Sequence, residues 1–439
     1  MFGDTIRPIL RAFVAFSLIA PSAVALTVTT QSEVALAAPS GSRDPAFETL
    51  LGSQAFGDGG TSTGVNAAVQ LGSYIYFGGS FLKTNGDATI KYLAKYDPAT
   101  DTVSAVDEWQ GGNVVNALAT DGTYLFVGGS FVNHRSVATA DHLVKYNPAA
   151  ASGSKWAPML RGTGQQVIPY ATTTLVNSLV YNSATSTLYA GGYWGTLASP
   201  AVANTQNLLA ITNLSSANST VTAIANTSCL SPGIQQLKLR TTGPRAGDLY
   251  AVGYCARIAY TGVLGSSTGT IPYVARLSSG SWDAIASSGL TYTNTNSSST
   301  TGLKYSTYHA AYPRAIAVDE DSEVVYVGGF FTYYGKASTD VDRVIYNGLM
   351  KANDNPASRT SWTAVSTGSS IGVYAATSTT LIMSLTWISG DGVYVGGGFT
   401  KRGGANNGTE ASTGETNIRN LARIPGSGGS AGQIVVGGG

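Results

Sequence analysis

A short apolar stretch that ends in glycine recurs along the chain and limits the folds that it can adopt. Six copies occur, five of them with a glycine pair, at residues 74–79, 124–129, 188–192, 249–253, 325–329 and 393–397. Two positions after each copy stands a large or buried-type residue: Phe81, Phe131, Trp194, Cys255, Phe331 or Phe399. Tyr, Val, Leu and Phe fill the stretches, as in β-strands. Repetition of this kind predicts an array of similar β modules.

Three further β-like segments accompany each copy, so each repeat is predicted to have four strands. First strands are expected at residues 65–68, 115–118, 176–179, 234–239, 315–318 and 381–388. Third strands are expected at 93–96, 143–146, 208–211, 274–277, 349–351 and 421–424, and fourth strands at 102–106, 155–159, 221–225, 281–285, 361–365 and 433–436. Dipeptides such as Asp121-Gly122 and Asp391-Gly392 join the first two strands and favour a tight hairpin.

A four-stranded meander cannot bury both of its faces alone, so repeated sheets stack around an axis. The predicted fold is therefore all-β: a six-bladed β-propeller of four-stranded antiparallel blades over residues 65–439. Glycine lacks a Cβ atom, so each glycine pair would let the neighbouring blade approach closely. A tandem of β-sandwiches is the alternative, and the continuous repeats without linkers disfavour it.

The repeats resemble the kelch and galactose-oxidase family of propellers. Members have a glycine pair closing strand two, a Tyr in strand three and a Trp in strand four, which Gly128-Gly129, Tyr146 and Trp156 match. Trp282 and Trp362 match in blades four and five, whereas blades three and six lack this residue.

A second motif precedes the first repeat. Asp44-Pro45-Ala46-Phe47, followed by residues 56–60, is similar to the delta-60 type of propeller repeat. A similar Tyr-Val-Gly-Gly-x-Phe pattern occurs in the ectodomains of fungal cortical polarity markers. Both resemblances imply a secreted or surface-exposed protein.

The first 25 residues have the order of a secretory signal peptide. Arg7 and Arg11 precede an apolar run over residues 12–20, and small residues follow at Ala23-Val24-Ala25. Residues 35–37 form a second possible cleavage site, and an uncleaved anchor over residues 10–28 is the alternative. Residues 26–64 are left as an N-terminal segment: a spacer, a strand donated to a neighbour or a clasp on the ring. No membrane span is expected in the mature chain.

Export determines how the cysteines are interpreted, because close pairs oxidise outside the cytoplasm. Cys229 and Cys255 are the only two, and they flank the first two strands of the fourth repeat, so a disulfide is predicted; two buried thiols are the alternative. Five sequons are candidate glycosylation sites: Asn213, Asn218, Asn226, Asn296 and Asn407.

Charge and catalytic patterns exclude several function classes. Charged residues make up 11% of the chain and the net charge is +1, so nucleic acid is not an expected partner. The three histidines do not reproduce the copper ligands of radical oxidases, and the arginine cluster of sialidases is missing. No cofactor and no metal are expected. Residues 319–323 form an acidic run that would suit calcium, although a solvated hairpin tip is the preferred interpretation.

Loop lengths predict the ligand face. Second-to-third connections lengthen toward the C-terminus, and these lie on the same side as the blade-to-blade connections, so binding is expected there. Tyrosine, with small polar neighbours, is typical of adaptable recognition surfaces, and the candidate binding residues are Tyr292, Tyr305, Tyr308, His309, Tyr312, Tyr333 and Tyr334. The alternative is that these side chains pack the loops onto the propeller.

Three function classes remain. The expected one is a non-enzymatic extracellular or cell-surface propeller that binds protein, adheres or assembles with itself. The second is a lectin-like propeller that binds glycans, and the third is a secreted carbohydrate-active enzyme.

Overall fold

The computed structural model describes most of the chain between residues 64 and 425. The described ranges are 64–82, 84, 87–100, 102–162, 164–168, 171–198, 201–202, 205–224, 227–259, 270–271, 274–283, 285, 302–306, 309–310, 312–331, 333–335, 344–355, 360–365, 373–374, 381–399, 401–402, 416–417 and 421–425. These ranges contain β-strands and two 3-10 helices, at His134–Ser136 and Gly243–Arg245, and no α-helix. The predicted signal peptide and residues 26–63 lie outside them.

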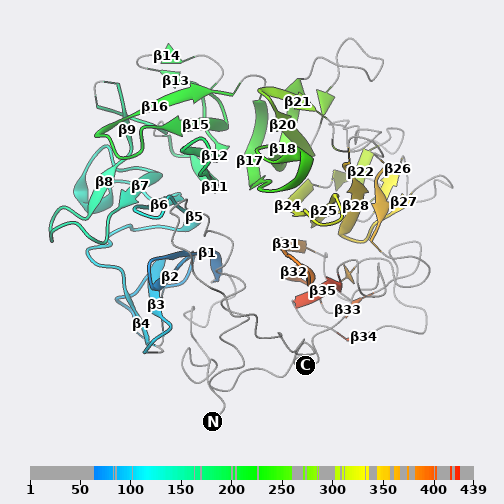
Figure 1. Ribbon diagram of the computed structural model, residues 1–439, viewed down its shortest axis with the longest axis horizontal. Coiled ribbons are helices and arrows are strands. Elements are labelled where there is room, and N and C mark those ends of the chain that lie inside the picture. Colours follow the sequence, from blue (N-terminus) through cyan, green and yellow to red (C-terminus); the bar gives the residue numbers. More distant parts are fainter. Residues whose placement is uncertain are drawn as a thin grey trace, which may run out of the picture.

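Six small antiparallel sheets stand in a ring, which confirms the predicted six-bladed β-propeller (Figure 1). The first blade consists of β1 (Val65–Leu71), β2 (Tyr74–Gly79), β3 (Leu93–Asp97) and β4 (Thr102–Ala105). The second consists of β5 (Val115–Thr120), β6 (Leu125–Gly129), β7 (Leu143–Tyr146) and β8 (Trp156–Pro158). The third consists of β11 (Leu175–Asn182), β12 (Thr187–Tyr193), β15 (Leu208–Thr212) and β16 (Asn218–Ala223).

The other three blades follow the same order. The fourth consists of β17 (Thr227–Leu239), β18 (Leu249–Ala259), β20 (Val274–Ser278) and β21 (Ser281–Asp283). The fifth consists of β24 (Tyr312–Asp319), β25 (Val324–Phe330), β28 (Leu349–Asn353) and β29 (Thr363–Ala364). The described part of the sixth blade consists of β31 (Leu381–Ile388), β32 (Gly392–Gly398) and β35 (Leu421–Pro425). The fourth strand predicted at residues 433–436 lies outside the described residues.

The first glycine of each of four pairs lies where one blade meets the next, whereas a second glycine such as Gly129 faces the backbone of its own blade, at the Val114 carbonyl. A Cβ atom added at Gly128 would stand 2.5 Å from Val176 Cγ1 of the following blade, and one at Gly191 would stand 2.9 Å from Ile234 Cγ2. Gly78 and Gly328 face Val115 and Ile382 in the same way. A side chain at these positions would push two sheets apart, which is the physical reason for the repeated glycine.

The hydrophobic core is divided among the junctions between consecutive blades. One buried cluster joins each pair of neighbours from the first blade to the sixth, for example Tyr76 and Leu93 with Val115 and Leu118 between the first two. No described cluster joins the sixth blade to the first; a smaller one, Phe81 with Ile90 and Ala94, lies within the first blade. Five of the six junctions are therefore built on apolar packing between described residues.

Candidate functional site

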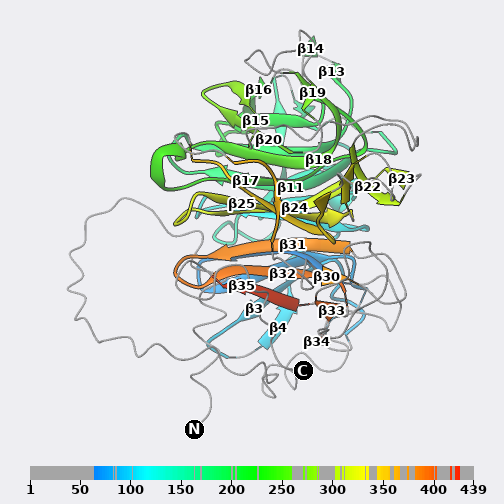
Figure 2. The same ribbon diagram turned by 90° about the vertical axis from the view of Figure 1, so that its right-hand side faces the viewer.

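One side of the ring carries the connections in which all the additional strands of the described residues fall. This side, here called the loop face, is where second strands connect to third strands and where each blade connects to the next; the opposite side is the turn face. The additional strands are β9 (Leu160–Arg161), β10 (Gln165–Gln166), β13 (Leu197–Ala198), β14 (Ala201–Val202), β19 (Thr270–Ile271), β22 (Gly302–Ser306), β23 (His309–Ala310), β26 (Tyr333–Gly335), β27 (Val344–Ile345), β30 (Val373–Tyr374), β33 (Lys401–Arg402) and β34 (Thr416–Asn417). Every one falls in such a connection, whereas short turns join first and second strands (Figure 2).

The largest additional sheet contains four of the seven residues predicted to bind. It has the order β23-β22-β26-β27, and it joins the connection before the fifth blade to the second-to-third loop of that blade. Tyr305 and His309 lie on β22 and β23, and Tyr333 and Tyr334 lie on β26, where they pair with Lys304 and Leu303.

The remaining candidate residues lie outside the described strands of this sheet. Tyr312 begins β24, the strand that enters the fifth blade. Tyr292 and Tyr308 lie outside the described residues. Between the two loops, the backbone pairs residues that are more than 20 positions apart in the chain.

A chain of amide side chains links the first strands near the axis. Each first strand has a bulge opposite its glycines, and the extra residue is Asn66, Asn116, Asn177, Gln235, Arg314 or Met383. Asn66 Nδ2 donates to Asn116 Oδ1 at 3.3 Å, and Asn116 Nδ2 donates to Asn177 Oδ1 at 3.4 Å. Asn177 Nδ2 then donates to the carbonyl of Ile234 at 2.9 Å. The recurring Val-Asn pair was visible in the sequence, but only the ring geometry shows that its amides bond from blade to blade.

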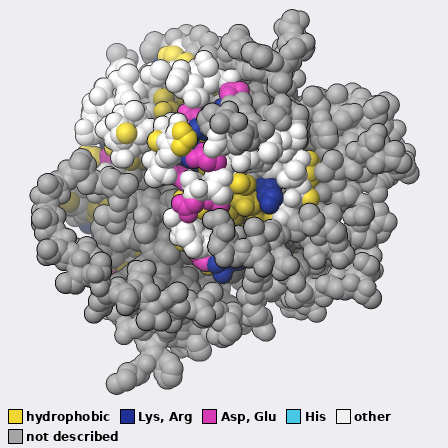
Figure 3. Space-filling model, turned by 45° about the vertical axis from the view of Figure 1, so that its right-hand side comes forward, with side chains coloured by type: hydrophobic (Ala, Val, Ile, Leu, Met, Phe, Trp, Pro, Cys, Tyr) yellow, Lys and Arg dark blue, Asp and Glu magenta, His cyan; other side chains and the backbone are white. Residues whose placement is uncertain are grey.

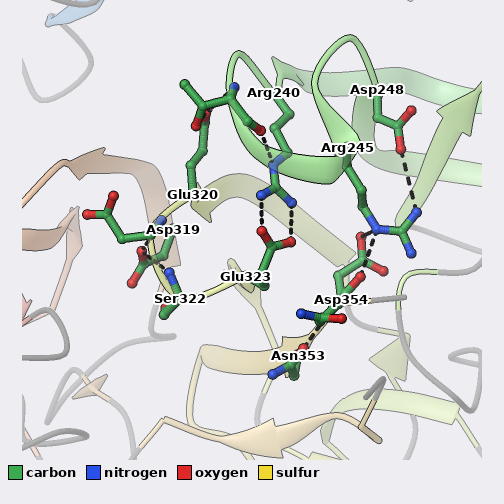
Figure 4. Close-up of polar contacts among 12 residues, drawn as sticks. Arg240, Arg245, Asp248, Asp319, Glu320, Ser322, Glu323, Asn353 and Asp354 are labelled. Atoms are coloured by element: carbon green, nitrogen blue, oxygen red, sulfur yellow. Dashed lines mark hydrogen bonds and ion pairs between the residues drawn. The ribbon is translucent and has the colours of Figure 1, made fainter. Parts of the chain in front are cut away.

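The acidic run 319–323 connects blades on the turn face (Figure 4). Glu320, 5% exposed, accepts hydrogen bonds from the backbone and hydroxyl groups of Thr241 and Thr242, with Thr242 N at 2.7 Å. Glu323 forms a bidentate ion pair with buried Arg240. The prediction of a solvated hairpin tip was therefore wrong for these carboxylates, because partners from the fourth blade surround them.

The same run also reaches the sixth blade. Asp319 Oδ1 accepts the backbone N–H groups of Asp321 and Ser322 within the turn, each at 3.1 Å. Asp321 accepts hydrogen bonds from Ser389 Oγ and Gly390 N, both at 3.2 Å. Hydrogen-bond donors of the protein thus contact the carboxylate oxygens that would have to be the ligands of a calcium ion. Figure 3 shows acidic side chains gathered in a band with basic side chains beside it, rather than scattered singly.

A second ionic group lies between the fourth and fifth blades and is almost fully buried. Asp354, 1% exposed, accepts hydrogen bonds from Arg276 Nη1 at 2.5 Å and from Tyr250 Oη at 2.9 Å. Arg245 Nε donates to the Asp354 carbonyl at 2.8 Å. Burial alone would lower the pKa of Arg276, but the hydrogen bonds and charge of Asp354 raise it. The group joins the fourth and fifth blades and leaves no charge unpaired, as a buried ion pair requires.

An aromatic group covers the connection between the first two blades. Trp109 stacks on His134 with centroids 4.7 Å apart, and Trp156 lies against His134 at 4.6 Å. His134 is 2% exposed, and burial, followed by the charge of Arg135, lowers its pKa to about 4. The ring is therefore neutral at physiological pH.

Asp107, beside this group, is held by two lysines. Its carboxylate accepts hydrogen bonds from Lys155 at 2.6 Å and Lys95 at 2.9 Å, and these bonds lower its pKa to about 2. Glu108 pairs with Arg135 at 2.6 Å. Both carboxylates have structural partners in this structure.

The cysteines lie opposite each other in the backbone register. Cys229 of β17 pairs with Cys255 of β18, beyond the part of the hairpin that belongs to the blade. Of the sequons, Asn213 and Asn218 are exposed, while Asn226, Asn296 and Asn407 lie outside the described residues.

Among the residues that the structure describes, no group of three or more His, Cys, Asp and Glu side chains is arranged to hold a metal ion. No described helix has the length and apolar character needed to cross a membrane.

The fold defines the class of the protein: it is a six-bladed β-propeller. No protein-family model and no curated protein matches the chain.

Proposed function

We propose that the chain is a secreted or cell-surface, non-enzymatic β-propeller of the kelch and galactose-oxidase type that binds protein through its loop face. One observation carries the proposal. The additional sheet of β22, β23, β26 and β27 is built from two separate loops, and it brings Tyr305, His309, Tyr333 and Tyr334 together. An ordered platform on a rigid scaffold is how folds of this kind present a binding surface.

Export and processing belong to the same proposal. The signal peptide over residues 1–25, a Cys229–Cys255 disulfide and glycans on Asn213 and Asn218 are what an extracellular protein of this sequence would carry. The backbone pairing of the two cysteines supports the disulfide, since paired residues of antiparallel strands lie within bridging distance. N-terminal sequencing of the exported chain tests the cleavage site.

Self-association tests the binding surface. Light scattering after size-exclusion chromatography, over a wide range of concentration, should show association of the parent protein that Tyr333→Ala/Tyr334→Ala weakens at least tenfold. Tyr124→Ala removes a half-buried tyrosine from the turn face and is the matched control, expected to leave association unchanged. A protein that is monomeric throughout, and that captures no surface protein from its host, would contradict the proposal.

A glycan ligand is the second candidate, because tyrosines also stack on sugar rings. A glycan array separates the two. Binding to defined glycans that the Tyr333→Ala/Tyr334→Ala variant loses, with no protein partner, would favour the lectin-like function. Turnover of an arrayed glycan would favour an enzyme.

A further inference from the structure

The second-to-third loop of the second blade places a single buried side chain against the ring. Each of residues 132–138 is described, and His134 alone among them is buried, whereas Val132 and Val137 are exposed. The His134 ring lies between Trp109 and Trp156, with centroids 4.7 Å and 4.6 Å away. Neither of its nitrogens has a hydrogen-bond partner in the described part of the chain, and Trp109 Nε1 has none there either. Ring packing, and not a polar bond, therefore anchors this side chain.

The two tryptophans are held by other parts of the chain, so they can stay in place when the loop moves. Trp156 Nε1 donates to the carbonyl of Asp107 at 2.7 Å. The Trp109 ring covers Gly111 so closely that a Cβ atom added there would strike it. Both indoles thus belong to the body of the propeller, whereas His134 belongs to the loop.

The backbone of the loop is strained. Asn133, Arg135 and Ser136 have φ angles of 50°, 54° and 59°, in the left-handed region that non-glycine residues seldom adopt. Release of the loop would relieve this strain. It would also give water access to the nitrogens of His134 and Trp109, which buried polar groups normally require. Both effects favour an open form of the loop.

The charged groups around His134 are bonded to one another and not to the imidazole. Those that can titrate or carry charge come from the first blade, the crossing segment, the loop and the third-to-fourth hairpin: Lys95, Asp107, Glu108, Arg135, Asp141, His142, Tyr146 and Lys155. Asp107 accepts hydrogen bonds from the two lysines, Glu108 pairs with Arg135, and Asp141 accepts a hydrogen bond from Gln166 Nε2 at 2.7 Å. A protonated His134 would therefore be a buried cation without an acceptor, beside the charge of Arg135.

We propose that residues 132–140 form a pH-sensitive lid on the loop face, which protonation of His134 releases from Trp109 and Trp156, so that acid exposes the two indoles. In the closed lid the pKa of His134 is about 4, whereas a released imidazole has its ordinary value of about 6.5. Because the open form binds the proton more tightly, the equilibrium constant for release should rise about 100-fold from pH 7 to pH 4.

Hydrogen exchange of the full-length protein at several pH values tests the lid. The amides of Ser136, Val137 and Ala140 donate to carbonyls within the loop, so their protection factors report its opening. We expect these factors to fall about 100-fold from pH 7 to pH 4 and to stay below those of β6 and β7 throughout. Equal protection of the loop and the two strands would mean that the loop opens only when the blade unfolds, and would overturn the proposal.

Variants identify the group that titrates. His134→Phe keeps a ring between the tryptophans but binds no proton, so protection of the loop should no longer depend on pH. Acrylamide quenching of tryptophan fluorescence should increase from pH 7 to pH 4 in the parent protein and not in this variant. Glu108→Gln, which weakens the contact to Arg135, and His142→Asn, at a residue with a φ of 60°, are the matched controls and should keep the pH dependence.

Two results would assign the switch to another group and refute the lid. One is pH dependence that persists in His134→Phe. The other is pH dependence that is lost in either control while the loop amides stay protected at pH 7. None of these readouts involves the tyrosine positions of β22 and β26, so the outcome is independent of the proposed binding function.

Discussion

Alanine at each glycine of one pair should destabilise the propeller to different degrees, because different atoms face the two residues. At Gly128 an added Cβ meets the side chains of Val176, at 2.5 Å, and Leu179, at 3.2 Å. At Gly129 it meets the backbone carbonyl of Val114, closer than van der Waals contact. The Val176 side chain can change rotamer or shift, whereas the Val114 carbonyl can move only with the backbone that leads into β5.

Overpacking of a core typically costs about 1–3 kcal/mol and occasionally more. We expect Gly128→Ala to cost an amount in that range and Gly129→Ala to cost more than about 3 kcal/mol. An unfolding entropy of about 2.1 cal/mol/K per residue makes each kcal/mol worth about 1 °C of Tm in a domain of this length. Gly112→Ala, where an added Cβ has no atom within 4 Å, is the matched control and should leave the Tm within about 1 °C.

A double-mutant cycle tests the reasoning further. Val176→Ala removes Cγ1, the atom nearest to a Cβ added at Gly128, so Gly128→Ala/Val176→Ala should be more stable than the sum of the single changes by about 1 kcal/mol or more. The same partner should not rescue Gly129→Ala. Equal costs for the two glycines, or no coupling between residues 128 and 176 by thermal and denaturant unfolding, would refute the packing argument.

Three further outcomes are expected. Asp354→Asn removes the most deeply buried of the carboxylate charges that pair with Arg276 and Arg245, and it should cost about 3–5 kcal/mol by denaturant unfolding. Asp283→Asn, at a carboxylate 39% exposed, should cost less than about 1 kcal/mol; similar costs would contradict the role assigned to burial. The folded protein holds the pKa of His134 at about 4, so the unfolded chain binds a proton at this ring at a higher pH than the folded protein does. The free energy of unfolding should therefore fall as the pH drops from about 6.5 to 4, by up to about 3 kcal/mol, and His134→Phe should flatten this pH dependence. An unchanged pH dependence in the variant would show that this ring does not titrate as described. Alkylation of the exported, denatured protein should modify Cys229 and Cys255 only after reduction, and reduction should lower stability by about 3 kcal/mol on the chain-entropy model; thiols that react before reduction would show that the bridge is not formed.

Much of the propeller could be predicted from the sequence because its signals are local. Alternating apolar residues, Asp-Gly turns and glycine pairs each depend on neighbours within one hairpin, so strand order and blade number follow from repetition. The bulge in each first strand was not predicted, although residues such as Asn66 and Asn116 mark it. Its role becomes visible only when neighbouring first strands stand side by side.

The contacts between blades depend on residues far apart in the chain, and only the tertiary structure decided them. Residues 319–323, as sequence, favour a solvated turn over a calcium loop, and neither describes Glu320 and Glu323, because their partners Thr241 and Arg240 lie about 80 positions earlier. The repeat determined that blades exist and the order in which their strands follow one another. Which carboxylate meets which arginine, and which loops share a sheet, depended on the rotation between blades, which no local pattern encodes.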